Sequence, residues 1–125
     1  MSYQLAISEK PGYLHFTVTG PNTVENVRGY LQDVFREAEV RNCASILIEE
    51  RLTGKRLETW DVYQIAAAGG SQLAGRMNAV AYVDVNAHGD LMKFAETVLN
   101  NRGLPMNVFA TVAEAEAWLA GRTRP

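Results

Sequence analysis

The closing third of the chain constrains the fold most, because a helix stop, a strand and a capped helix follow one another there. Gly103 stands where a left-handed helix cap belongs, and Pro105 prevents the helix from continuing. The mostly apolar residues 106–110 predict a strand. Thr111 and Glu114 then have the spacing of a capping box at the start of a final helix. A strand enclosed by two helices predicts an α/β fold.

The same alternation of strand and helix patterns runs through the rest of the chain. Pro11 and Gly12 lie between two alternating segments, residues 3–8 and 13–19, and this arrangement predicts a β-hairpin. Apolar residues then recur at helical spacing after an expected cap at Asn22. The expected elements are strands at residues 3–8, 13–19, 45–49, 79–83 and 106–110, and helices at residues 22–41, 59–77, 90–102 and 111–119.

These elements give the order ββαβαβαβα in one domain, residues 1–125, with residues 121–125 as a frayed tail. Strands separated by single helices are joined by right-handed parallel crossovers. We therefore predict a single-layer, mixed, mostly parallel sheet with an antiparallel N-terminal hairpin strand and flanking helices. Trp118 shares the apolar face of the last helix with Leu119, so we expect Trp118 in the core.

Charge and composition exclude several classes of partner. The net charge is −2 and the twelve Lys and Arg residues are scattered, so we expect no nucleic-acid binding. The one cysteine, Cys43, cannot form an internal disulfide, which is typical of a reducing compartment. The first residues lack the pattern of a signal peptide, and no apolar stretch approaches the ~20 residues that span a bilayer. We expect a cytoplasmic protein without a membrane span.

Several short motifs along nearly the whole chain carry a family resemblance. They are the opening hairpin, Gly20 before the first helix, Ile46-Leu47-Ile48-Glu49 with the polar loop after it, the segment from Ala79 to Asp84, and Asn101-Arg102-Gly103 followed by the last strand and Trp118-Leu119. With these motifs the sequence resembles the SpoIIAA-like family, whose STAS-type fold is also similar to Sec14-like domains. The resemblance implies this fold and a regulatory role in protein interaction.

One functional feature of the family lacks its counterpart in this sequence. Anti-sigma-factor antagonists of this fold are switched by phosphorylation of a serine that opens the helix after the central strand. The matching segment, residues 49–59, contains no serine, and its only hydroxyl residues are Thr53 and Thr59. A turn residue and a helix cap account for these two threonines. We therefore expect a protein without the serine phospho-switch.

Candidate site residues are expected beyond the carboxyl ends of the parallel strands, where ligands bind in sheets of this kind. Asp84, Asn86 and His88 carry donors suited to a cation or to a carboxylate-oriented base, although Asp and Asn are also typical of turns. His15 lies opposite the apolar residues of its strand and is expected to face solvent or to pair across strands. We assign no catalytic, cofactor-binding or metal-binding residue. The candidate rim for a ligand or partner comprises Glu49, Glu50, Arg51, Thr53, Thr59, Asp84, Asn86 and His88.

Three classes of function follow from these features. The leading interpretation is a non-catalytic regulatory or protein-interaction domain with a protein partner that the sequence does not identify. The alternative is a binder of a small apolar or lipid-like ligand, held in a groove beside the second helix, where small residues are frequent. An enzyme that uses residues 84–88 ranks third. The apolar, glycine-containing second helix also suggests a homodimer, since most homo-oligomers have two-fold symmetry.

Overall fold

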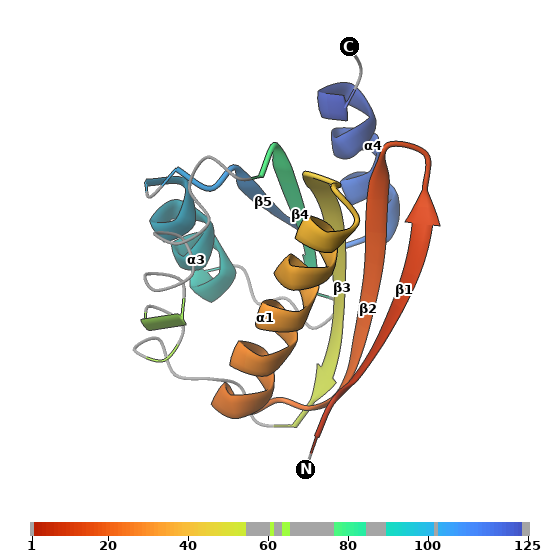
Figure 1. Ribbon diagram of the computed structural model, residues 1–125. Helices are drawn as coiled ribbons and strands as arrows, with labels where there is room; N and C mark the ends of the chain where they lie inside the picture. The colour runs from red at the N-terminus through yellow and green to blue at the C-terminus, as the bar shows by residue number, and fades with distance from the viewer. Residues whose placement is uncertain are drawn as a thin grey trace.

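A five-stranded mixed sheet forms the centre of the structure (Figure 1). This computed structural model describes residues 2–54, 61, 64–65, 77–84, 90–101 and 103–123. The strands lie side by side in the order of the chain; β1 is antiparallel to β2, and all other neighbours are parallel. The predicted mixed, mostly parallel sheet is therefore confirmed. The described elements are β1 (Gln4–Lys10), β2 (Tyr13–Pro21), α1 (Val24–Val40), β3 (Ser45–Thr53), β4 (Ala79–Asp84), α3 (Asp90–Asn101), β5 (Met106–Phe109) and α4 (Val112–Thr123).

The predicted second helix, residues 59–77, lies mostly outside the described residues. Within it, Asp61, Gln64 and Ile65 are helical. Met77 is buried but stands outside any helix. Among the described residues, no helix combines the length and the apolar character needed to cross a membrane.

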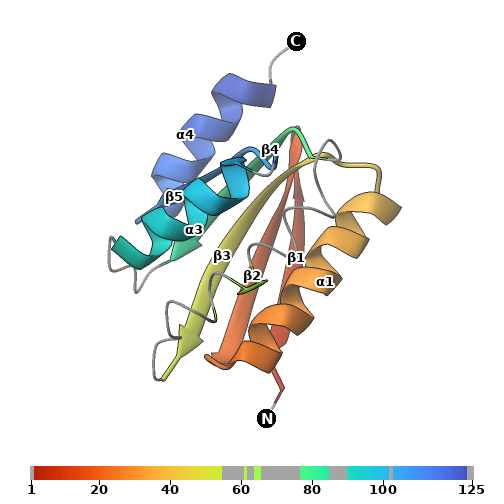
Figure 2. The ribbon, with the colours of Figure 1, turned by 90° about the vertical axis from the view of Figure 1, so that its left-hand side faces the viewer.

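Helices cover the two faces of the sheet unequally (Figure 2). On one face, α1 and α3 pack over a large core that includes Phe16, Ile46 and Ile48. On the opposite face, α4 packs over a smaller core around Leu47 and Ala115, behind β3, β4 and β5. Burying a large apolar side chain in this way contributes ~1.5–3 kcal/mol. The two cores fix which residues of each strand face which layer.

The end of α3 has the predicted stop. The N–H of Gly103 donates to the carbonyl of Asn100 at 3.0 Å, and the N–H of Leu104 donates to the carbonyl of Leu99 at 3.0 Å. This pair of bonds is the Schellman motif, which needs a left-handed residue at the position of Gly103. Its φ of 87° is readily adopted only by glycine. The helix stop predicted from the sequence is confirmed.

The predicted cap of α4 is also confirmed, whereas Trp118 departs from its expected place. The Thr111 hydroxyl accepts the N–H of Glu114 at 3.2 Å and donates to the Glu114 carboxylate at 3.0 Å. Trp118 is half-buried and lies against Phe109, with ring centroids 5.6 Å apart. It therefore borders the smaller core, and the fully buried side chain at this end of α4 is Leu119.

The cap of α1 is Thr23, one residue after the predicted Asn22. The Thr23 hydroxyl accepts the N–H of Asn26 at 3.1 Å. The backbone N–H of Asn22 donates instead to the Thr53 carbonyl at 2.7 Å, at the end of β3. This long-range bond holds Asn22 against the sheet, so the next residue that can cap takes the position.

Three further expectations are corrected. β3 continues to Thr53 rather than ending at Glu49, because β2 runs beside it as far as Pro21 and pairs with it from Ile46 to Thr53. α4 continues to Thr123, so residues 121–123 are helical rather than frayed; no proline interrupts the helix before the last residue of the chain. Phe94, expected on the inner face of α3, is 38% exposed, because the buried stripe runs through Ala95 and Val98.

Candidate functional site

The extended β3 divides the candidate rim between the two faces of the sheet. Successive side chains of a strand point to opposite faces. Glu49 and Arg51 therefore share the α4 side with Leu47, while Glu50 and Leu52 share the α1 side. The sequence Glu49-Glu50-Arg51 thus contributes to two separate polar clusters rather than to one.

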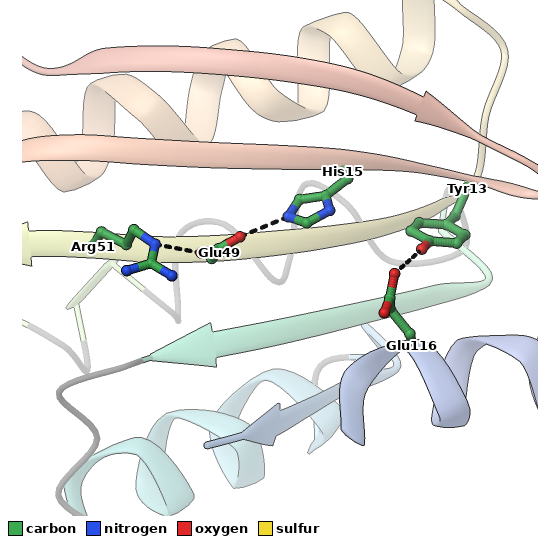
Figure 3. Close-up of polar contacts among 5 residues, drawn as sticks. All are labelled: Tyr13, His15, Glu49, Arg51 and Glu116. Atoms are coloured by element: carbon green, nitrogen blue, oxygen red, sulfur yellow. Dashed lines mark hydrogen bonds and ion pairs between the residues drawn. The ribbon is translucent and has the colours of Figure 1, made fainter. Parts of the chain in front are cut away.

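The first cluster is a row of three side chains on the α4 side of β2 and β3 (Figure 3). The Glu49 carboxylate lies between His15, whose Nε2 is 2.8 Å from Oε1, and Arg51, whose Nε donates to Oε2. The side chains of His15 and Glu49 are 15% and 10% exposed, whereas that of Arg51 is 51% exposed. We call these three residues the His15–Glu49–Arg51 row. His15 pairs across strands, as expected from its place in the sequence.

The electrostatics of the row keep Glu49 ionised. Burial alone would raise the pKa of Glu49, but hydrogen bonds from His15 and Arg51, together with the charge of Arg51, outweigh burial and lower it. Because the Glu49 carboxylate is largely enclosed, the exposed charge of the row is the guanidinium of Arg51.

Tyr13 joins the same side of the sheet to α4. Its hydroxyl donates to the Glu116 carboxylate at 2.7 Å, as Figure 3 shows. Burial, this hydrogen bond and the charge of Glu116 raise the pKa of Tyr13 to about 12. The contact fixes the start of β2 against the last helix.

The second cluster lies on the α1 side and is centred on Glu50, which is 8% exposed. One carboxylate oxygen, Oε1, accepts the N–H of Leu52 at 2.8 Å. The other, Oε2, accepts the hydroxyl of Tyr82 at 3.1 Å, and that hydroxyl is 2.7 Å from the hydroxyl of Tyr30 on α1. Burial, followed by the negative charge of Asp84, raises the pKa of Glu50 to about 7. Burial likewise raises the pKa of both tyrosines.

Two further rim residues stand where β3 and β4 end. Asp84 is the register partner of Glu50, so these two acids occupy neighbouring positions on adjacent parallel strands. Thr53 is exposed, and its hydroxyl donates to the Gly20 carbonyl at 3.5 Å. The structure thus brings Glu50 together with Asp84, and Glu49 together with Arg51.

The other three rim residues, Thr59, Asn86 and His88, lie outside the described residues, as does most of the second helix. The apolar groove and the dimer contact were expected beside that helix, so these two expectations also fall outside the described residues. Within the described part of the chain, no three His, Cys, Asp or Glu side chains are arranged to hold a metal ion.

Sequence reasoning missed Tyr30 and Tyr82 as members of a polar cluster. Both carry a mainly apolar ring in a buried pattern, so the sequence alone shows only core residues. The one usable signal was the spacing of Tyr30 with Val34 and Ala38, which places the tyrosine on the inner face of the helix. The alternation of Glu49, Glu50 and Arg51 would have separated the two clusters, had β3 been expected to continue past Glu49.

Comparison with known proteins supports the fold. No family model and no curated protein matches the sequence. Among solved structures, the chain is similar to an uncharacterized protein of the DUF3478 family from Shewanella loihica PV-4, described as having a SpoIIAA-like fold. The identity is 22%, the match covers 94% of this chain and 93% of that chain, and the TM-score is 0.53. The chain therefore has a SpoIIAA-like fold, as its sequence motifs indicated.

Proposed function

We propose that this chain is a non-catalytic protein-interaction domain that binds an acidic segment of a partner protein. The binding surface would be the part of the α4-side face that the described helices leave uncovered (Figure 2). We call it the open face. It comprises the outward residues of β1 and β2, apart from the register pair Lys10 and Tyr13, and the polar end of β3: Gln4, Ala6, Ser8, His15, Thr17, Thr19, Glu49 and Arg51.

The side chains of the open face suit a polar partner rather than an apolar ligand. Their inward neighbours in β1 and β2, such as Leu5, Phe16 and Val18, pack into the large core under α1. Of the outward set, only Ala6 is apolar. Sheet faces of this composition usually face water, so a partner would bind here through hydrogen bonds and charge rather than through apolar burial.

The exposed charge of this face is the single observation that carries the proposal. Glu49 is enclosed, whereas half of the Arg51 side chain is open to solvent. Arg51 uses Nε to hold Glu49, and within the described residues its two terminal nitrogens make no further hydrogen bond. The one contact of the guanidinium drawn in Figure 3 is that from Nε to the Glu49 carboxylate. A guanidinium presented in this way binds a carboxylate through two parallel hydrogen bonds.

The contacts within the row also support a role without catalysis. His15 and Arg51 both bind the same carboxylate, so each charged group is held by another member of the row. Such a row presents a fixed charge pattern, which gives specificity and a faster association rate.

A nuclear magnetic resonance titration tests the proposal. Nitrogen-15-labelled protein is titrated with hexaglutamate and, separately, with hexalysine. We expect hexaglutamate alone to shift the amides of β1, β2 and Arg51, and we expect Arg51→Gln to weaken this binding at least about fivefold. Arg36→Gln is the matched control, since Arg36 is an exposed arginine that binds Asp33 on α1, across the sheet. Shifts that map to α1, or equal binding by Arg51→Gln, would contradict the proposal.

A further inference from the structure

A continuous chain of hydrogen bonds connects the carboxyl end of β3 with the middle of α1. It runs from the Glu50 carboxylate to the hydroxyl of Tyr82 on β4, at 3.1 Å, and from there to the hydroxyl of Tyr30 on α1, at 2.7 Å. Tyr30 is fully buried, and Tyr82 and Glu50 are nearly so. The three groups come from β3, β4 and α1, so a change in the protonation of Glu50 alters a hydrogen bond made by α1.

The surroundings of Glu50 decide which oxygen can carry a proton. Oε1 already accepts the N–H of Leu52 at 2.8 Å. A proton on Oε1 that pointed along this hydrogen bond would clash with the hydrogen of the N–H group. Oε2 faces the hydroxyl of Tyr82, which can either donate or accept. A proton taken up by Glu50 therefore belongs on Oε2.

The direction of the chain then depends on the charge of Glu50. With Glu50 ionised, Tyr30 donates to Tyr82 and Tyr82 donates to Oε2, so every hydroxyl hydrogen in the chain has an acceptor. With Glu50 protonated, Oε2 donates to Tyr82 and Tyr82 donates to Tyr30. The hydrogen of the Tyr30 hydroxyl then has no acceptor among the described residues, where its only hydrogen-bond partner is Tyr82.

We propose that this chain is a proton-operated switch, in which proton uptake by Glu50 reverses the hydrogen bonds and leaves the Tyr30 hydroxyl on α1 to find a new acceptor. A buried donor without an acceptor is unfavourable. The protonated state therefore loosens the packing of α1 locally around Tyr30, although protonation relieves the cost of burying the Glu50 charge for the fold as a whole.

The groups that face Glu50 are compatible with such a switch. Within the described residues, the titratable ones are Tyr82 and Asp84 from β4 and Tyr30 from α1, while β2 places the apolar Val18 beside it. Because burial and Asp84 raise the pKa of Glu50 to about 7, both states are populated near neutral pH. The switch is independent of the open face, which lies on the other side of the sheet.

Nuclear magnetic resonance tests the switch directly. The carboxyl carbon of Glu50 and the ring carbons of Tyr30 and Tyr82 are followed from about pH 5 to about pH 9. We expect all three to titrate together with a midpoint near 7, and we expect the amides around Tyr30 to exchange faster with solvent on the acidic side once the intrinsic pH dependence is removed.

Two variants separate the switch from its alternatives. Glu50→Gln should abolish the tyrosine titration, while Glu96→Gln, which alters another carboxylate bound to a backbone N–H, should leave it unchanged. Tyr82→Phe interrupts the chain, so Glu50 should titrate without a response at Tyr30. The proposal fails if the tyrosines do not follow Glu50, if Tyr30 still responds in Tyr82→Phe, or if Glu50 shares its proton with Asp84 and the tyrosine signals stay constant.

Discussion

Glu49 and Glu50 stand next to each other in β3 but belong to opposite faces of the sheet. Glu49 lies between two basic side chains, and its pKa is lowered. Glu50 lies among two tyrosines and Asp84, and its pKa is raised to about 7. Both carboxyl groups are similarly enclosed, at 8% residue exposure each. The comparison teaches that burial raises the pKa of both acids, and that the neighbours supplied by each face decide whether this effect is outweighed, as at Glu49, or reinforced, as at Glu50.

The two faces also differ in their cores, and this difference gives the largest expected effect. Phe16→Ala opens a cavity in the large core under α1, where the ring is fully buried, and should cost about 3–5 kcal/mol in the free energy of unfolding. Trp118→Ala removes a ring that only borders the smaller core, and should cost about 2 kcal/mol. Urea denaturation measures both. Equal losses in the free energy of unfolding for the two variants would show that the two cores contribute equally to stability.

Replacing Glu50 should stabilise the protein at high pH. The folded-state pKa of about 7 lies above the ordinary 4.5, so the contribution of Glu50 is greatest below 4.5 and is lost as the pH rises through 7. Glu50→Gln removes the buried charge and should raise the free energy of unfolding by about 1–3 kcal/mol at about pH 8, with little gain in acid.

Urea denaturation across this pH range tests the effect of Glu50→Gln. The matched variant Glu96→Gln should show no gain at high pH, because the Glu96 carboxylate on α3 accepts the backbone N–H of Val108 and also pairs with the cationic Lys93. A gain that is the same at every pH would point to packing rather than to charge.

Replacing Glu49 should change the free energy of unfolding in the opposite direction to replacing Glu50, and by a smaller amount. Its folded-state pKa is lowered, so its contribution is present above the ordinary value and is lost as the pH falls through the folded value. Glu49→Gln should therefore cost about 1 kcal/mol at neutral pH, because His15 and Arg51 lose a charged acceptor. The loss should shrink in strong acid. A loss that does not depend on pH would remove the electrostatic explanation.

Replacing Arg51 should have the smallest effect on stability. Half of its side chain is in solvent, where ion pairs are screened and contribute little. Arg51→Gln should change the free energy of unfolding by less than about 0.5 kcal/mol. The same variant should weaken hexaglutamate binding, so binding and stability respond differently to it. A large destabilisation would assign Arg51 to the structure rather than to recognition.

The sequence was a better guide to the fold than to the site, and the reason is the range of the interactions involved. The stop at Gly103 and the cap at Thr111 depend on residues within a few positions, so local patterns predict them. The cap of α1 was misplaced by one residue because the bond from Asn22 to Thr53 is long-range. Local patterns cannot show such a partner.

The clusters at the end of β3 were out of reach for the same reason. Glu49 meets His15 across 34 positions, and Glu50 meets Tyr82 across 32. The rim residues were chosen because they follow apolar runs, and that rule found Glu49, Glu50 and Arg51. It could not assign them to faces, because the assignment depends on where β3 ends, and β3 ends only where its partner β2 ends.

The strand order has a consequence for how the chain folds. From β2 onward, each strand pairs with the one that precedes it in the sequence, so it finds a partner that has already been made. The β1–β2 hairpin can form first from contacts close in sequence, and each later strand then adds to one growing edge. Folding rates rise when contacts are local, and chains emerge from the ribosome N-terminus first. We expect this sheet to assemble strand by strand during synthesis, with α4 closing the second face as the final step.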